Sequence, residues 1–135
     1  MKSFYFSTRT AYLLIAVTAT LLLHNVVHTA DGWLVDFEKA KAQAAKEGKS
    51  LLMEFTGSDW CPPCKSLAEK VLTKEVFKKE VPKDFVLLKL DNPRDKSKQT
   101  PEEIEQYKTL SKKYGIQGVP TIFLADAKGR PYWQT

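Results

Sequence analysis

The sequence predicts an α/β fold in which a central sheet is flanked by helices. From Asp31 onward, segments with helical patterning alternate with short apolar runs of strand length, which is typical of one α/β domain. The apolar runs show little polar alternation, which indicates strands covered on both faces. The 135 residues suffice for one such domain once a targeting segment is set aside.

The N-terminus has the features of a targeting segment. Lys2 and Arg9 make it positive, and residues 11–23 form an uncharged, mostly apolar run. This run is shorter than the roughly 20 residues of a membrane span and fits the apolar core of a secretory signal.

Two fates of this segment stay open. Ala30 offers a cleavage point, whereas apolar character continuing beyond the run allows residues 11–27 to anchor an uncleaved chain in a membrane. We therefore expect a signal peptide or membrane anchor over residues 1–30, a domain over residues 31–135, and a periplasmic or secreted protein.

The charge pattern argues against a nucleic-acid partner. The chain has a net charge of +5, and without Lys2 and Arg9 it has 19 basic against 16 acidic residues, a net +3. Lysines and glutamates are interleaved along residues 38–49, as on a solvated helix face. A nucleic-acid surface would need a clustered basic stripe with interleaved aromatic residues, and the sequence has none.

The domain begins with a predicted helix and strand. Residues 33–47 favour a helix, with Asp36 as the cap at its start and Gly48 at its end. Residues 50–56 then form an apolar run that predicts a buried strand.

The next helix is expected to begin at paired prolines, because proline fits a first helical turn, where its missing N–H is not needed. It is predicted over residues 62–72, and Thr73 is expected to cap a further turn that contains Val76 and Phe77.

A second strand, a loop and a third helix follow. Residues 85–90 predict a buried strand, and the polar residues 91–99 an exposed loop. Thr100, Pro101 and Glu103 together signal a capped helix start. The apolar stripe of this helix, which we expect to pack in the core, consists of Ile104, Tyr107, Leu110 and Tyr114.

The last part of the chain predicts two more strands. Gly115 ends the helix, and residues 119–124 form a third apolar run with Pro120 near its start. Residues 126–129 form a turn, and residues 130–133 begin another strand.

The chemistry is predicted to lie in the segment Trp60-Cys61-Pro62-Pro63-Cys64. A disulfide closing so small a loop restrains the unfolded chain little, so reactivity explains the pair better than stability does. A helix N-terminus favours a thiolate, which attacks a disulfide, and a second cysteine one turn along resolves the mixed disulfide. We predict Cys61 as an exposed attacker and Cys64 as a more buried resolver, with no cofactor beyond their disulfide.

The neighbouring residues tune this pair. Pro63 has no N–H, so Cys61 receives one donor fewer than it would with glycine there, and its thiol is less acidic. A less stabilised reduced form makes the pair a better reductant, so Pro62 and Pro63 favour a reductase. Trp60 either offers an apolar docking surface or packs on the helix.

Metal binding and haem attachment are disfavoured. Closed zinc sites use four ligands, whereas the chain has two cysteines, and both histidines, His24 and His28, lie in the targeting segment. Haem attachment would need histidine after the second cysteine, where Lys65 stands.

Two motifs together resemble the thioredoxin superfamily: residues 60–65 after an apolar strand, and Gly118-Val119-Pro120-Thr121 about 55 residues later. The stretch over residues 33–61 is similar to exported bacterial thioredoxin-like proteins related to periplasmic thiol–disulfide interchange proteins. The resemblance runs from about Trp33 to Tyr132.

The resemblance implies a thioredoxin-like fold with a central mixed sheet flanked by helices. It also implies that Pro120 follows a cis peptide bond and faces the cysteines, leaving Val119 to pair with a substrate strand. Members of the superfamily finish with a further strand and helix, so we expect the domain to be incomplete at its C-terminus.

Glu54 matches a buried acid that helps to deprotonate the resolving cysteine in thioredoxins. Here the residue is Glu rather than Asp, and one extra residue separates it from the cysteines. A buried Glu54 with a raised pKa could relay a proton, or its side chain could reach out to the edge of the strand.

The sequence therefore predicts a thiol–disulfide oxidoreductase that acts on protein disulfides outside the cytoplasm, as a reductase more than an oxidase or isomerase. A non-catalytic thioredoxin-like interaction domain is the other alternative. Because exported compartments are oxidising, family and compartment imply a membrane-embedded thiol carrier as electron donor.

Overall fold

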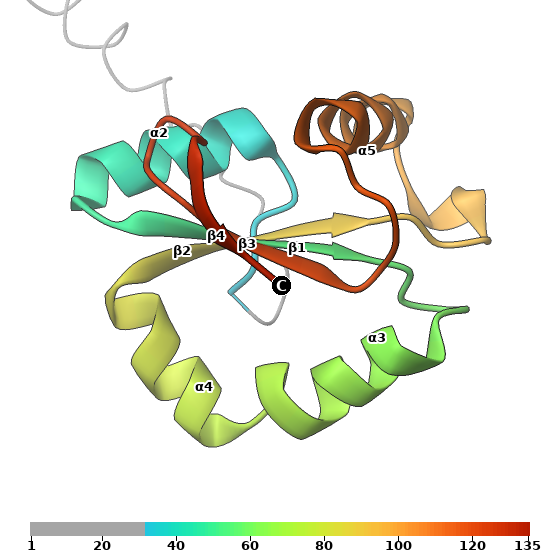
Figure 1. The fold of residues 1–135 in the computed structure, drawn as a ribbon, viewed down its shortest axis with the longest axis horizontal. Helices are drawn as coiled ribbons and strands as arrows, with labels where there is room; N and C mark the ends of the chain where they lie inside the picture. The colour runs from blue at the N-terminus through green and yellow to red at the C-terminus, as the bar shows by residue number, and fades with distance from the viewer. Residues whose placement is uncertain (1–31) are drawn as a thin grey trace, which may run out of the picture.

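A computed structural model describes residues 32–135. A four-stranded mixed sheet, with strand order β2-β1-β3-β4, lies between two helical layers. Figure 1 shows α2 and α5 on one face of the sheet and α3 and α4 on the other. This confirms the predicted α/β fold with flanking helices. Residues 1–30, for which the sequence predicts a signal or an anchor, lie outside the described residues.

Three strands form the centre of the sheet. β1 (Ser50–Thr56) pairs in parallel with β2 (Phe85–Asp91) and antiparallel with β3 (Thr121–Ala125). Every residue of β1 after Ser50 is buried, as its unbroken apolar pattern predicts. The edge strand β4 (Pro131–Gln134) pairs with β3, and its side chains are exposed.

Alternation along the strands divides the core into two clusters. One packs the sheet against α2 and α5 and centres on Phe55, whose ring makes edge contacts with Tyr107, Tyr114 and Phe123. The other packs the opposite face against α3 and α4; its buried members are Trp33, Leu52, Leu72 and Leu87. Ile104 is 36% exposed and does not belong to the core, contrary to its predicted place in the buried stripe.

The first helix is shorter than predicted. α2 spans Phe37–Glu47, with Asp36 as N-cap and Gly48 in the left-handed conformation at its end. Residues 33–35 are not helical because Leu34 pairs with β2: its N–H donates to Leu87 O (2.8 Å), and its carbonyl accepts from Lys89 N (2.8 Å).

The helix after the cysteines changes its winding. α3 (Pro62–Leu67) continues into a π-helical turn, η1 (Ala68–Leu72), and α4 (Glu75–Glu80) follows. Thr73 ends η1 rather than capping α4, because its hydroxyl donates to the carbonyl of Ala68 at 2.9 Å. The predicted role of Thr73 is therefore wrong.

The chain then passes through short 3-10 turns, η2 (Val81–Lys83) and η3 (Lys96–Lys98), on either side of β2. Within residues 32–135, no helix has the length and apolar character needed to cross a membrane.

The last helix begins where the sequence predicts. α5 spans Pro101–Tyr114 and ends at Gly115. The Thr100 hydroxyl accepts from Glu103 N (3.2 Å), and the Glu103 carboxylate accepts from Thr100 N (2.8 Å), which completes a capping box.

We expect Thr100→Ala to lower the free energy of unfolding by about 1 kcal/mol, because it leaves a helix N–H without its acceptor. Thr100→Ser retains the hydroxyl and is the matched control. Urea unfolding followed by circular dichroism measures both. Equal losses in the two variants would contradict a capping role.

Candidate functional site

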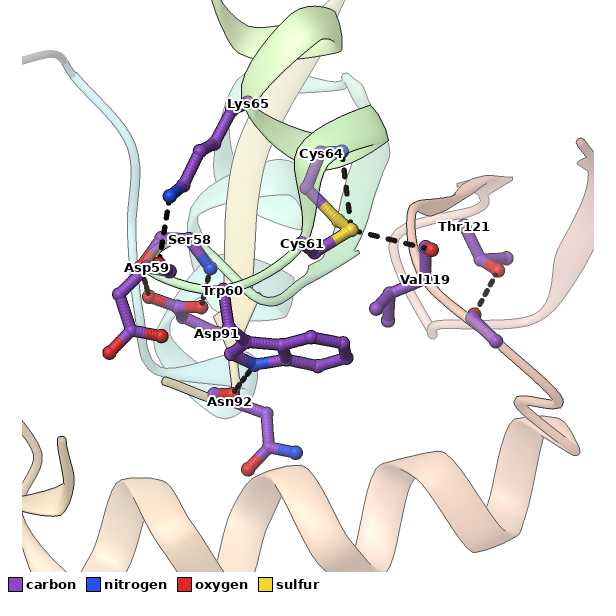
Figure 2. The surroundings of a disulfide bond; sticks show 11 residues. Ser58, Asp59, Trp60, Cys61, Cys64, Lys65, Asp91, Asn92, Val119 and Thr121 are labelled. Atoms are coloured by element: carbon purple, nitrogen blue, oxygen red, sulfur yellow. Dashed lines mark hydrogen bonds between the residues drawn. A yellow bond between two sulfur atoms is a disulfide. The ribbon is translucent and has the colours of Figure 1, made fainter. Parts of the chain in front are cut away.

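The two cysteines lie where β1 passes into α3. Cys61 N donates to Gly57 O (2.9 Å), which closes the turn after the strand. Cys61 is the N-cap of α3, and its Sγ accepts from Cys64 N at 3.2 Å. The two residues are joined by a disulfide (Figure 2).

The paired prolines limit the donors around Cys61. They occupy the first two positions of α3, so the helix start offers Sγ the single N–H of Cys64. The helix N-terminus still favours a thiolate. Besides this effect of the helix N-terminus, a thiolate at Cys61 would be stabilised by one backbone hydrogen bond, from Cys64 N.

Both cysteines are buried in the disulfide form. Each has 2% of its surface exposed, so the prediction of an exposed Cys61 and a more buried Cys64 is wrong for this state. Cys61 is covered because its Sγ lies 3.6 Å from the carbonyl oxygen of Val119. The asymmetry between the cysteines lies in this contact, which only Cys61 makes.

The segment before β3 faces the disulfide. Val119 and Pro120, which the sequence places in the third strand, precede β3 and are joined by a cis peptide bond. Figure 2 shows Val119 opposite Cys61, with the Thr121 hydroxyl donating to Gly118 O (2.8 Å). Within the described residues, the Val119 N–H has no acceptor.

Trp60 is held beside Cys61 by three contacts. Its Nε1 donates to Asn92 O at 2.8 Å. The Arg94 guanidinium carbon lies 5.5 Å from the centroid of the indole ring. Gly57 allows the close approach of the ring, because a Cβ there would lie 2.5 Å from ring carbon Cε2.

Two aspartates tie the loop after β1 to the loop after β2. The Asp59 carboxylate accepts from Arg94 N (2.9 Å) and Asp95 N (3.1 Å). In return, the Asp91 carboxylate accepts from the backbone N–H and the hydroxyl of Ser58. We call these four hydrogen bonds the aspartate clamp.

No motif in the sequence indicates the clamp, since the polar residues 91–99 predict only an exposed loop. The available signal was the order of the elements: loops that follow two neighbouring parallel strands meet at one edge of the sheet. Backbone hydrogen bonds from Arg94 and Asp95 lower the pKa of Asp59, because they favour its ionised carboxylate.

Glu54 lies inside the protein, with 2% of its surface exposed, rather than at the edge of the strand. Its Oε2 is buried without a hydrogen-bond partner among the described residues. Burial raises the pKa of Glu54, while Lys89 and a hydrogen bond with Thr56 act in the opposite direction. By strand alternation with Leu52, it faces the side of the sheet that α3 and α4 cover.

Within residues 32–135, no group of three or more histidine, cysteine or acidic side chains is placed to hold a metal ion. The structure thus brings Cys61, Cys64, Trp60 and Val119 together at one edge of the sheet, with Glu54 buried on the same face as α3.

The family model described as thioredoxin-like matches residues 32–127. The chain therefore belongs to the thioredoxin-like family.

Curated relatives include two proteins of Chlamydia pneumoniae. The disulfide bond reductase DsbH is 27% identical over 94 residues, which cover 70% of this chain and 56% of DsbH. The thioredoxin-related protein DsbJ is 27% identical over 128 residues, 87% of this chain and 36% of DsbJ. The chain thus spans about half the length of DsbH and about a third of DsbJ.

Solved structures show the same fold. A structure described as DsbH oxidoreductase matches with a TM-score of 0.72 at 22% identity, covering 86% of this chain and 79% of that one. The disulphide isomerase of Xylella fastidiosa Temecula1 matches with a TM-score of 0.57 at 26% identity, covering 73% and 69%. The fold predicted from the motifs is confirmed.

We expect Glu54→Gln to stabilise the protein at neutral pH. Because the pKa of Glu54 is raised on folding, the folded chain holds this proton more tightly than the unfolded chain. The contribution of Glu54 to the free energy of unfolding is therefore most favourable below the ordinary glutamate pKa. This contribution falls as the pH rises through the pKa of Glu54 in the folded chain.

Urea unfolding between pH 4 and pH 8 tests this expectation. The free energy of unfolding of Glu54→Gln should exceed that of the wild type at pH 8, and the difference should narrow toward pH 4. The same substitution at the exposed Glu69 is the control. A difference in the free energy of unfolding that does not vary with pH would contradict the raised pKa of Glu54.

Proposed function

We propose that this protein is a thiol–disulfide oxidoreductase that reduces disulfides of proteins outside the cytoplasm. The observation that carries the proposal is the Cys61–Cys64 disulfide at the start of α3, in contact with the Val119 carbonyl. A helix start activates a thiol, and a second cysteine one turn away allows the pair to cycle between dithiol and disulfide.

The reaction begins from the dithiol form. The Cys61 thiolate attacks one sulfur of the substrate disulfide, whose S–S bond breaks, and the other substrate sulfur leaves and takes up a proton. The Cys64 thiol then loses its proton and attacks Cys61 Sγ. The mixed disulfide breaks and releases the second substrate thiol, so two electrons pass to the substrate.

Residues around the pair are suited to hold a substrate. The Val119 N–H, which has no acceptor among residues 32–135, can donate to an extended substrate chain lying along this segment. The half-buried indole of Trp60 offers apolar surface beside Cys61. Both features support the binding roles that the sequence suggests for Trp60, Val119 and Pro120.

Glu54 is the proposed acceptor of the Cys64 proton. Its burial, its unpaired Oε2 and its raised pKa suit a group that must accept a proton and later release it. In this role the carboxylate would act on Cys64 during resolution.

The prolines support the reductase direction. With one N–H donor at Cys61 Sγ, the thiolate gains little stabilisation, and the reduced pair gives up electrons more readily. The similarity to DsbH, a disulfide bond reductase, supports this direction. The likeness to a disulphide isomerase of 26% identity makes isomerase activity the second candidate.

The targeting features of residues 1–30 support export or membrane anchoring. A reductase in an oxidising compartment must be re-reduced after each turnover. We propose a membrane-embedded thiol carrier as the electron donor.

Insulin reduction with dithiothreitol as the donor tests the function. The wild type should accelerate precipitation of the insulin B chain, and Cys61→Ala should abolish the acceleration. Cys64→Ala should accumulate mixed disulfides through Cys61, whereas Cys61→Ala should not. A folded wild-type protein without turnover would leave only a non-catalytic interaction domain.

A redox titration separates the directions. A reduction potential of about −270 mV for the Cys61–Cys64 pair supports a reductase, whereas one of about −120 mV indicates a strong oxidant. We expect Pro63→Ala to raise the potential by about 30 mV or more, because it restores a second N–H within reach of Cys61 Sγ.

Pro62→Ala is the matched control. It restores an N–H at the first helical position, whereas capping atoms accept from the second and third positions. A Pro63→Ala variant whose potential matches that of Pro62→Ala would contradict the tuning role of Pro63.

A further inference from the structure

A cation lies over the aromatic side chain that precedes the proposed nucleophile. The Arg94 guanidinium carbon is 5.5 Å from the centroid of the Trp60 ring, and Trp60 immediately precedes Cys61. Figure 2 shows the indole next to the disulfide, with its Nε1 bound to the carbonyl of Asn92. We call the indole and this guanidinium the Arg94–Trp60 platform.

Hydrogen bonds of Asp59 hold the loops that carry the platform. The Asp59 carboxylate accepts from Arg94 N at 2.9 Å, which fixes the backbone that carries the guanidinium. The Lys65 ammonium donates to the Asp59 carbonyl at 2.8 Å and adds a second cation to the same loop. The position of Arg94 therefore does not depend on its own flexible side chain alone.

Within residues 32–135, the guanidinium of Arg94 has no carboxylate partner. Arg94 is also exposed. The nearby acids are engaged elsewhere: Asp59 and Asp91 bind the donors of the aspartate clamp, and Asp95 binds Ser97 and Lys98. The donors of Arg94 thus remain available to an incoming anion.

We propose that Arg94 is a specificity-determining residue that selects protein substrates with an acidic side chain close to the reactive cysteine. This inference rests on the proposed function. A guanidinium that lies over an indole keeps its N–H edge for a carboxylate, which it can bind through two parallel hydrogen bonds. An extended chain rises about 3.3 Å per residue, so a side chain two residues from a sulfur held at Cys61 lies about 7 Å from that sulfur, within the reach of a residue next to Trp60.

The test uses the full chain and three otherwise identical peptides, each with one cysteine in a mixed disulfide with an uncharged aromatic thiol that reports its release. The residue two positions before the cysteine is Glu, Gln or Lys. With dithiothreitol as the electron donor and its uncatalysed reaction subtracted, the measured quantity is the ratio of kcat/KM for the Glu peptide to that for the Lys peptide.

For the wild type we expect a ratio of about five at low ionic strength, since a solvent-exposed ion pair supports about that much discrimination. The ratio should fall as salt is added, because salt screens exposed charges. Arg94→Gln should bring it close to one, and Arg94→Lys should retain part of it.

Lys128→Gln is the matched control, because it removes one positive charge from the β3–β4 turn, at the opposite end of β1 from the cysteines. This variant should keep the wild-type ratio. A wild-type ratio near one, or an Arg94→Gln variant that keeps the wild-type ratio, would overturn the role of Arg94. Failure of the wild type to reduce any of the three peptides would instead overturn the proposed function.

Discussion

The parallel pairing of β1 with β2 is the constraint on which the site depends. It places Thr56 opposite Asp91, so that both strands end at the same edge of the sheet. The loop that leads to Cys61 and the loop that carries Arg94 must therefore lie side by side. The antiparallel partner β3 begins at this edge, with Thr121 opposite Phe55, and brings Val119 to the cysteines.

Much of the fold could be predicted because its signals are local. Apolar runs marked the strands, and Thr100 and Gly115 marked the ends of α5. The cysteine pair and Val119-Pro120 came from short motifs whose spacing reports their place in the fold. The prediction is wrong where tertiary contacts outweigh local helix preference. Leu34 forms hydrogen bonds with β2 instead of joining a helix, since only the folded sheet offers it a partner.

The unpredicted part of the site depends on distant contacts. Asp59 and Arg94 are 35 residues apart, and neither segment alone predicts their hydrogen bond. The burial of Cys61 likewise depends on Val119, 58 residues further on. The position of the two thiols at a helix start indicates which is more reactive. It does not indicate which distant segments bury them.

Gly57 allows the indole of Trp60 to be fixed before any partner is present. With no side chain at this position, the indole of Trp60 rests directly on the backbone of its own loop, and Asn92 holds it from the neighbouring loop. The rotamer entropy of this large side chain is thus given up during folding rather than during association. Under the proposed function, a target protein would meet an indole that is already fixed in place, and the free energy of its contacts with the ring would contribute to affinity.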